Sequence, residues 1–241
     1  MLPPQDQEVV LSTTGGTVTS WRYKGKDIFY PQQTVLVGGV PKLRGGMHPC
    51  FPNFGEVNSA FGLPPHGSLR TMRGERLHEN LIRFESDELF GVEKVRCNVM
   101  VGLEWLERSF SYTLYARLMN APGKVPVNPG FHPYFSTPEG RATIFGSGKK
   151  LLEVSGDTFK EIVPLNSRII VVLPGVGAVD MNPLDHFTNA AYARLVVWRD
   201  RADYLCVEPI LAEPALYGTL GPHLHPGEAM KLGCSFHLLG S

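Results

Sequence analysis

The run S-F-S-Y-T-L-Y-A-R-L-M, from Ser109 to Met119, decides the fold class of this chain. Every second residue in it is apolar, as Phe110, Tyr112 and Leu114 show, and most residues between them carry a polar group. Such alternation predicts a β-strand with one buried face, because successive side chains of a strand point to opposite sides of a sheet. The run from Met230 to Leu238 alternates in the same way, so we expect a second long strand there.

Shorter strand-like runs occur along the whole chain, and no window shows a 3.6-residue apolar stripe. Gly and Pro supply 26 and 20 of the 241 residues, which disfavours long helices. Many strands separated by turns predict an all-β fold, largely an antiparallel sandwich or barrel, and we expect a single domain over residues 1–241. The other predicted strands are Val9–Ser12, Thr17–Tyr23, Ile28–Tyr30, Arg76–Glu85, Val92–Val101, Ala142–Phe145, Ile169–Leu173, Ala193–Trp198 and Tyr204–Val207.

One long segment, from Val37 to Gly74, lacks a sustained period and is rich in Gly and Pro. It also carries Met47, Phe51 and other apolar residues, which argues against disorder. Long irregular segments in compact domains are usually functional, so we expect an ordered loop that lines a cleft.

Composition excludes several classes of partner. Lys plus Arg equals Asp plus Glu at 23 each, so no net charge attracts nucleic acid or an anionic membrane. The four cysteines are scattered without a C-x-x-C pair, which is typical of a reducing cytosol. The first residues resemble no signal peptide, and no apolar run approaches membrane-spanning length. We therefore expect a soluble, cytoplasmic protein.

The stretch V-N-P-G-F-H-P-Y-F, from Val127 to Phe135, holds a histidine between two prolines and three aromatic residues. Pro129 and Pro133 restrict the backbone, and Gly130 allows the chain to turn. His132 is thus expected to be rigid and partly desolvated, and to hold its proton near neutrality, as a general acid or base must. A structural core histidine is the alternative.

A second acid/base candidate is Glu208, in the run Y-L-C-V-E-P. A carboxyl group beside buried apolar residues is expected to have a raised pKa, and Pro209 is expected to end the strand at this point. Arg44 and Arg70 stand near glycines and are candidates for binding a substrate oxyanion, with surface arginines as the alternative. His66 is a candidate donor to a sugar hydroxyl or an ordinary loop histidine.

Five motifs follow one another along the chain: R-G-G-M-H-P-C-F-P-N-F-G (Arg44–Gly55), P-P-H-G-S-L-R-T-M-R-G-E (Pro64–Glu75), N-P-G-F-H-P-Y-F (Asn128–Phe135), C-V-E-P (Cys206–Pro209) and L-H-P-G-E (Leu224–Glu228). In this order they resemble the aldose 1-epimerase superfamily, and most of all its hexose-6-phosphate mutarotase branch. The resemblance implies a galactose mutarotase-like β-sandwich whose concave face binds a pyranose, and an isomerase that interconverts sugar anomers.

The resemblance also implies roles for particular residues. His132 corresponds to the general acid and Glu208 to the general base, while Arg44, His66 and Arg70 correspond to sugar or phosphate contacts. A further sugar contact is assigned to Asp180 in A-V-D-M, with Asp185 as its rival. The implied substrate is an aldose or a hexose phosphate, and the reaction requires no metal or organic cofactor.

The chain departs from the family pattern at its substrate-facing loops. A tryptophan usual in the first motif is absent around Pro52-Asn53-Phe54, H-G-F-A-R reads H-G-S-L-R, and the segment between Asp180 and Glu208 is compressed. These changes bear on sugar identity and phosphate recognition more than on the acid/base pair.

Two alternatives belong to other functional classes. A cupin-type metalloenzyme is suggested by His223, His225 and Glu228, since imidazoles two apart on a strand point the same way. The other is a non-catalytic carbohydrate-binding or sugar-sensing module on the same sandwich. Such a module does not require both His132 and Glu208.

Overall fold

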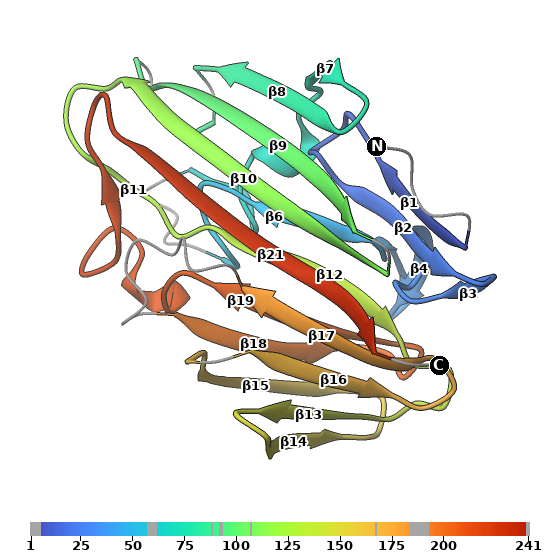
Figure 1. The fold of residues 1–241 in the computed structure, drawn as a ribbon. Coiled ribbons are helices and arrows are strands. Elements are labelled where there is room, and N and C mark those ends of the chain that lie inside the picture. The colour runs from blue at the N-terminus through green and yellow to red at the C-terminus, as the bar shows by residue number, and fades with distance from the viewer. Residues whose placement is uncertain are drawn as a thin grey trace.

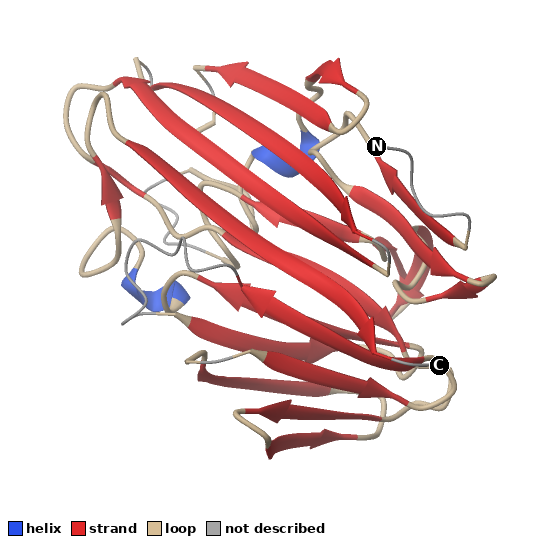
Figure 2. Cartoon of the chain, in the orientation of Figure 1, coloured by secondary structure: helices blue, strands red, loops and turns tan. Residues whose placement is uncertain are grey.

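The computed structural model describes residues 6–56, 62–87, 89–91, 94–106, 108–166, 168–183 and 193–239. Strands dominate this part of the chain, and its helical elements are short 3-10 turns, Leu69–Thr71 (η2) and Pro214–Leu216 (η4) (Figure 2). The predicted all-β fold class is therefore confirmed. None of the helical segments described is long and apolar enough to cross a membrane.

The first large sheet contains the strand that carries His132. Its pairings are antiparallel, and β3 (Lys26–Asp27) pairs with β2 beside the main order. The strands run in the order β1 (Gln7–Leu11), β2 (Val18–Tyr23), β6 (Met47–Cys50), β12 (Gly130–Ser136), β19 (Tyr204–Ile210), β18 (Arg194–Arg199) and β15 (Phe159–Pro164).

The second large sheet packs against the first and contains the two long alternating strands, β10 and β21 (Figure 1). Its order is β14 (Lys149–Val154), β13 (Ala142–Gly146), β16 (Ile169–Leu173), β17 (Gly177–Pro183), β21 (Ala229–Leu239), β10 (Ser109–Asn120), β9 (Arg96–Leu106), β8 (Leu81–Ser86) and β7 (Glu75–His78). Two short antiparallel pairs lie outside these sheets: the hairpin of β4 (Gln33–Val37) and β5 (Val40–Arg44), and the long-range pair of β11 (Val125–Pro126) and β20 (His223–Leu224).

Alternation along the strands builds the core between the sheets. The apolar positions of β10 and β21 that the sequence predicted to be buried all lie in one hydrophobic cluster. From the first sheet, Phe131 and Phe135 of β12 join the same cluster. Phe110 stacks on Phe236 at 5.0 Å between ring centroids and meets Trp21 edge-on at 5.2 Å. Large aromatic rings thus fill the space between the sheets and leave the opposite face of β12 for other side chains.

The first sheet differs from the expectation at β6 and at Gly130. Part of the predicted loop from Val37 to Gly74 is strand β6, which pairs with β12 near the middle of the sheet. Four residues are too few to show a period, so the pattern missed it. Gly130 begins a strand instead of a turn, and a Cβ there would lie 2.7 Å from Ile210 Cγ2. This glycine is required by close packing between strands.

Several strand boundaries also need correction. The predicted strand Arg76–Glu85 is two strands, β7 and β8, and the predicted strand Val92–Val101 is observed as Arg96–Leu106. Strand β19 continues through Pro209, which pairs with Leu195 of β18, so the proline does not end the strand. Glu208 therefore lies within the strand and not at its end.

Candidate active site

The register of two neighbouring strands places His132 opposite Glu208. Strand β12 pairs with β19 so that Gly130 meets Ile210 and Tyr134 meets Cys206. The position halfway between these pairs is His132 on one strand and Glu208 on the other. Phe131 and Val207 point into the core, so the alternating side chains of His132 and Glu208 share the outer face of the sheet.

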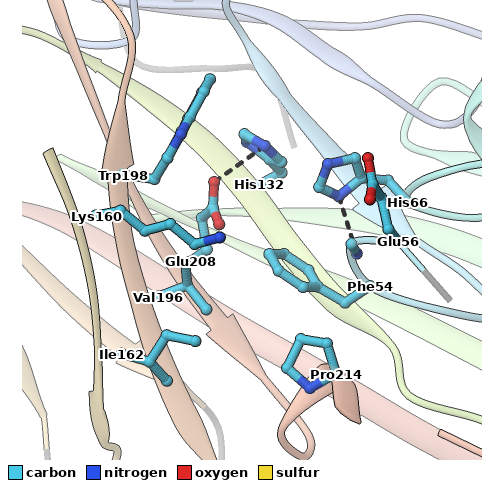
Figure 3. A pocket seen from close by; sticks show the side chains of 11 residues that line it. Phe54, Glu56, His66, His132, Lys160, Ile162, Val196, Trp198, Glu208 and Pro214 are labelled. Atoms are coloured by element: carbon cyan, nitrogen blue, oxygen red, sulfur yellow. Dashed lines mark hydrogen bonds and ion pairs between the residues drawn. The ribbon is translucent and has the colours of Figure 1, made fainter. Parts of the chain in front are cut away.

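The two side chains are in contact. His132 Nε2 lies 3.0 Å from Glu208 Oε1, and the side chains are only 5% and 2% exposed (Figure 3). Aromatic rings surround the imidazole, with Tyr134 stacked on it at 4.7 Å and His48 at 4.8 Å between centroids. His66 and Trp198 meet it edge-on. The predicted rigidity of His132 thus has a physical basis, because rings on several sides leave it little freedom to rotate.

Burial controls the proton affinity of the pair. It raises the pKa of Glu208 to about 8, in the direction predicted, although His66, a hydrogen bond with Cys206 and the charge of Lys160 act in the opposite direction. It lowers the pKa of His132 to about 3, and the charges of Arg70 and Arg44 act in the same direction. The expectation that His132 keeps its proton near neutrality is therefore wrong. At neutral pH the pair is a carboxylic acid beside a neutral imidazole, because desolvation disfavours both charged forms.

A cavity of about 450 Å³ opens above this pair. Its walls come from the outer face of β12, β18, β19 and β15 and from the loop that follows β6 (Figure 3). Aromatic and aliphatic side chains form much of the surface, and a few polar groups converge on it, which is typical of a small-molecule site. The lining residues are Phe54, Gly55, Glu56, His66, His132, Lys160, Ile162, Val196, Trp198, Glu208 and Pro214.

His66 reaches the cavity from the predicted substrate-facing loop. Its backbone N–H donates to the carbonyl of Gly55, and the N–H of Gly55 donates to Nδ1 of His66 at 3.3 Å. Because Nδ1 accepts, the proton of the neutral ring lies on Nε2. Burial lowers the pKa of His66 to about 3, so the ring stays neutral. His66, the candidate donor to a sugar hydroxyl, is thus a neutral ring with one N–H to donate.

Arg44 lies near the site but does not line the main cavity. Its guanidinium donates to Asp200 Oδ2 at 2.8 Å, and both side chains are largely buried, at 15% and 18% exposed. It also donates to the hydroxyl of Tyr204 and stacks over the ring of Trp198 at 5.3 Å. Its charge is therefore already balanced by a carboxylate of the protein.

Arg70 lies on the other side of the histidine stack, which is formed by the stacked rings of His132 and His48. It lines a small cavity of about 40 Å³ together with His48 and Tyr134. Its charge lowers the pKa of both His132 and His48, which places it close to these rings. The structure does not bring Arg70 and Arg44, the two predicted oxyanion-binding residues, together in the main cavity.

Asp180 lies on β17 of the second sheet, whereas His132 and Glu208 lie on the first sheet. Its carboxylate pairs with Arg168 at 2.8 Å, and it is not among the residues that line the cavity. The structure therefore does not place this predicted sugar contact at the site. Its rival, Asp185, falls outside the residues that the structure describes.

The sequence reasoning missed several residues that line the cavity or support it. Trp198 and Val196 were assigned to a predicted strand, but the face to which they point depends on the register with β19. Lys160 lies on β15, where the apolar residues do not alternate with polar ones, so the sequence pattern predicted no strand there. Asp200 directly follows β18 and had no motif to mark it. Long-range pairing alone brings these residues together.

Two groups of potential metal ligands occur at the site. One consists of His48, Cys50 and His66, and the other of His132, Cys206 and Glu208. The cupin alternative required a different set, His223, His225 and Glu228.

The cupin set does not form a ligand cluster within the described part of the chain. Glu228 instead accepts a hydrogen bond from the backbone N–H of His225 at 2.8 Å, which closes a turn. This use of the carboxylate removes the structural support for the cupin alternative.

A scan against known protein families and a search of curated proteins find no match to the chain. Solved structures do match. A candidate aldose 1-epimerase from Escherichia coli K12 has a TM-score of 0.76 at 14% identity, covering 100% of this chain and 98% of that one. A galactose mutarotase related enzyme from Lactobacillus acidophilus has the same score and identity, covering 99% and 96%.

A protein from Synechocystis sp. PCC 6803 also matches, with a TM-score of 0.74 at 20% identity, covering 98% of this chain and 93% of that one. At such identities, similarity establishes the fold alone. The chain has the galactose mutarotase-like β-sandwich fold, as the sequence motifs implied.

Proposed function

We propose that the protein is an aldose or hexose-phosphate 1-epimerase, which interconverts the anomers of a sugar by opening and closing its ring. The observation that carries the proposal is the contact between His132 and Glu208 in the floor of a sugar-sized cavity. A binding module has no use for a buried acid and base in contact. Placing them there is costly, because each charged form is desolvated.

The reaction needs one proton removed and one proton supplied. A pyranose is a cyclic hemiacetal, so opening takes the proton from the C1 hydroxyl and delivers a proton to the ring oxygen. Both oxygens are bonded to C1, and the two groups that serve them must therefore lie side by side. His132 and Glu208 meet this condition at 3.0 Å, closer than a full sugar width.

The pair carries one proton at neutral pH, and the proposed cycle conserves it. In the proposed cycle the proton first moves from Glu208 to His132 across their contact, against the order of their pKa values, so this transfer forms part of the reaction barrier. Glu208 then takes the C1 hydroxyl proton as His132 protonates the ring oxygen, which leaves an open aldehyde, a carboxylic acid and a neutral imidazole. After rotation about the bond between C1 and C2, the same transfers run in reverse and close the ring on the other face.

Other residues are proposed to hold the sugar. His66 directs its Nε2–H toward a hydroxyl, and Trp198 and Phe54 offer apolar surface to the faces of the ring. Arg44 and Arg70 are proposed to act at the edge of the site, where Arg44 also supports Trp198. No step calls for a metal or an organic cofactor.

The test is anomer exchange, followed by NMR exchange spectroscopy or polarimetry, on free and phosphorylated aldoses. The purified protein should accelerate exchange above the buffer rate. Glu208→Gln, which keeps the side-chain volume, and His132→Asn, which keeps a polar planar group, should each lose roughly 10²- to 10⁴-fold in kcat. The proposal fails if no aldose is exchanged faster, or if either variant keeps the wild-type rate. Sugar binding without exchange would favour a sugar-sensing module.

A further inference from the structure

We infer that Lys160 forms a subsite for a negatively charged substituent of the sugar, so that anionic aldoses are the preferred substrates. The inference rests on the proposed function and adds to it both a specificity-determining residue and a substrate charge. It differs from a clamp made by Arg44 and Arg70, which the structure does not assemble in the main cavity.

The position of Lys160 follows from the strand register. Lys160 on β15 pairs with Trp198 on β18, and Trp198 pairs with Cys206 on β19. Paired residues in neighbouring strands point to the same face, so Lys160 rises from the face that carries Trp198 and Glu208. Strands β15 and β19 are two spacings apart, roughly 10 Å. We place the sugar with C1 at Glu208 and its remote substituents toward β15, a separation that a hexose can span.

Lys160 is a cation without a counter-ion. It lines the cavity, and no ion pair or hydrogen bond of its side chain is found among the described residues. Arg44 is different, because Asp200 already balances its charge at 2.8 Å. The other ionisable group at the rim, Glu56, lies on the opposite side of the cavity beside His66 (Figure 3). The two walls thus carry opposite charges, and the wall at β15 is the positive one.

The charge of Lys160 makes an anionic sugar a better match for this wall than a neutral one. Lys160 is exposed to solvent at the cavity wall, and the neighbouring Ile162 and Val196 offer its ammonium group no polar partner. A hydroxyl group of a neutral sugar accepts a hydrogen bond from the ammonium group, whereas an anionic substituent adds the attraction of opposite charges to that bond. Phosphate and carboxylate both provide this chemistry, so an aldose phosphate and a uronic acid are the two sources to distinguish.

The experiment compares kcat/KM for glucose 6-phosphate, glucuronic acid and glucose in the wild type and in Lys160→Gln. We expect the variant to lose roughly 10- to 100-fold on the anionic sugars, the equivalent of one charge-assisted hydrogen bond, and less than about 3-fold on glucose. A loss on glucose 6-phosphate alone identifies phosphate as the partner. Lys231→Gln, on β21 of the other sheet, removes the same charge elsewhere and should leave all three values unchanged.

Two further arms separate this inference from its rivals. Arg70→Gln tests whether the anion is held on the other side of the histidine stack. The charge of Lys160 lowers the pKa of Glu208. The pH profile therefore tests whether Lys160→Gln acts only through that pKa. The inference is overturned if Lys160→Gln affects charged and neutral sugars equally, if it shifts only the pH profile, or if Arg70→Gln alone abolishes the preference.

Binding measurements keep the inference testable without turnover. Calorimetry with glucose 6-phosphate in the Glu208→Gln background should show a Kd that rises roughly 10- to 100-fold when Lys160→Gln is added. An unchanged Kd overturns the subsite. Failure of the wild type to exchange any sugar would instead contradict the proposed function, so the two outcomes are distinct.

Discussion

His132 and Glu208 stand directly opposite each other on neighbouring antiparallel strands, with Nε2 and Oε1 3.0 Å apart and both side chains almost fully buried. Since each strand also sends aromatic or aliphatic residues into the core, the packing that stabilises the sandwich also sets the position of the pair. The geometry of the site and the stability of the protein are therefore linked.

The first prediction concerns the pair as a unit. If one shared proton moves between His132 and Glu208, removing either group stops the cycle. The double variant His132→Asn/Glu208→Gln should therefore be about as active as the less active of the two single variants. Its fold-loss in rate should be far smaller than the product of the two single fold-losses. Initial rates of anomer exchange measure this. Multiplicative losses would show that the two residues act independently.

The second prediction concerns stability in acid. His132 is buried and His48 and His66 are partly buried, and desolvation lowers the pKa of all three, to about 3 for His66 and His132. In the unfolded chain each takes up a proton near pH 6.5. The unfolded state thus binds more protons, and the free energy of unfolding should fall as the pH falls from about 6.5 toward 3.

Each histidine contributes at most about 1.4 kcal/mol per pH unit to this fall. Urea unfolding at a series of pH values measures the slope. His66→Gln removes one titrating group and should reduce the slope by one proton. A slope unchanged in this variant would show that His66 is not held neutral by the fold.

The third prediction concerns the alkaline side. Burial raises the pKa of Glu208 from 4.5 to about 8, so the unfolded chain loses this proton first as the pH rises. The contribution of Glu208 to the free energy of unfolding should therefore fall as the pH rises from 4.5 to 8. Below about pH 6.5 the opposite effect of one histidine cancels this fall, and above pH 6.5 no histidine does so. Glu208→Gln should abolish this decline between pH 6.5 and 8 in the same unfolding series. A decline equal to that of the wild type would rule out a protonated Glu208.

The fourth prediction concerns the loop that carries His66. Gly67 has φ +78°, and a Cβ there would lie 2.1 Å from the carbonyl oxygen of Phe51. Gly67→Ala should therefore destabilise the protein by more than about 1 kcal/mol and displace His66 from the cavity. Urea unfolding and sugar binding measure the two effects.

A matched control exists for this substitution. Gly25 also has φ +78°, but no atom lies within 4 Å of a Cβ added there. Gly25→Ala reports the backbone strain alone, so the excess loss in Gly67→Ala measures the steric contact. Equal losses would mean that the loop moves away from β6 without consequence.

The sequence was sufficient to predict the site only in part. Motif positions identified His132, Glu208 and His66, which the structure brings to one cavity. They also pointed to Asp180, which the structure places on the other sheet with Arg168. A motif gives the order of residues along the chain, whereas a site depends on which strands become neighbours.

By itself, the sequence determined the fold class and the buried faces of the long strands, because alternation along β10 and β21 is a local property of successive residues. Tertiary structure alone decided that the short strand β6 lies beside β12 and that Lys160, Trp198 and Glu208 share one face. It also decided that burial makes His132 neutral. These outcomes depend on strand register and desolvation, which arise only when distant segments of the chain pack together.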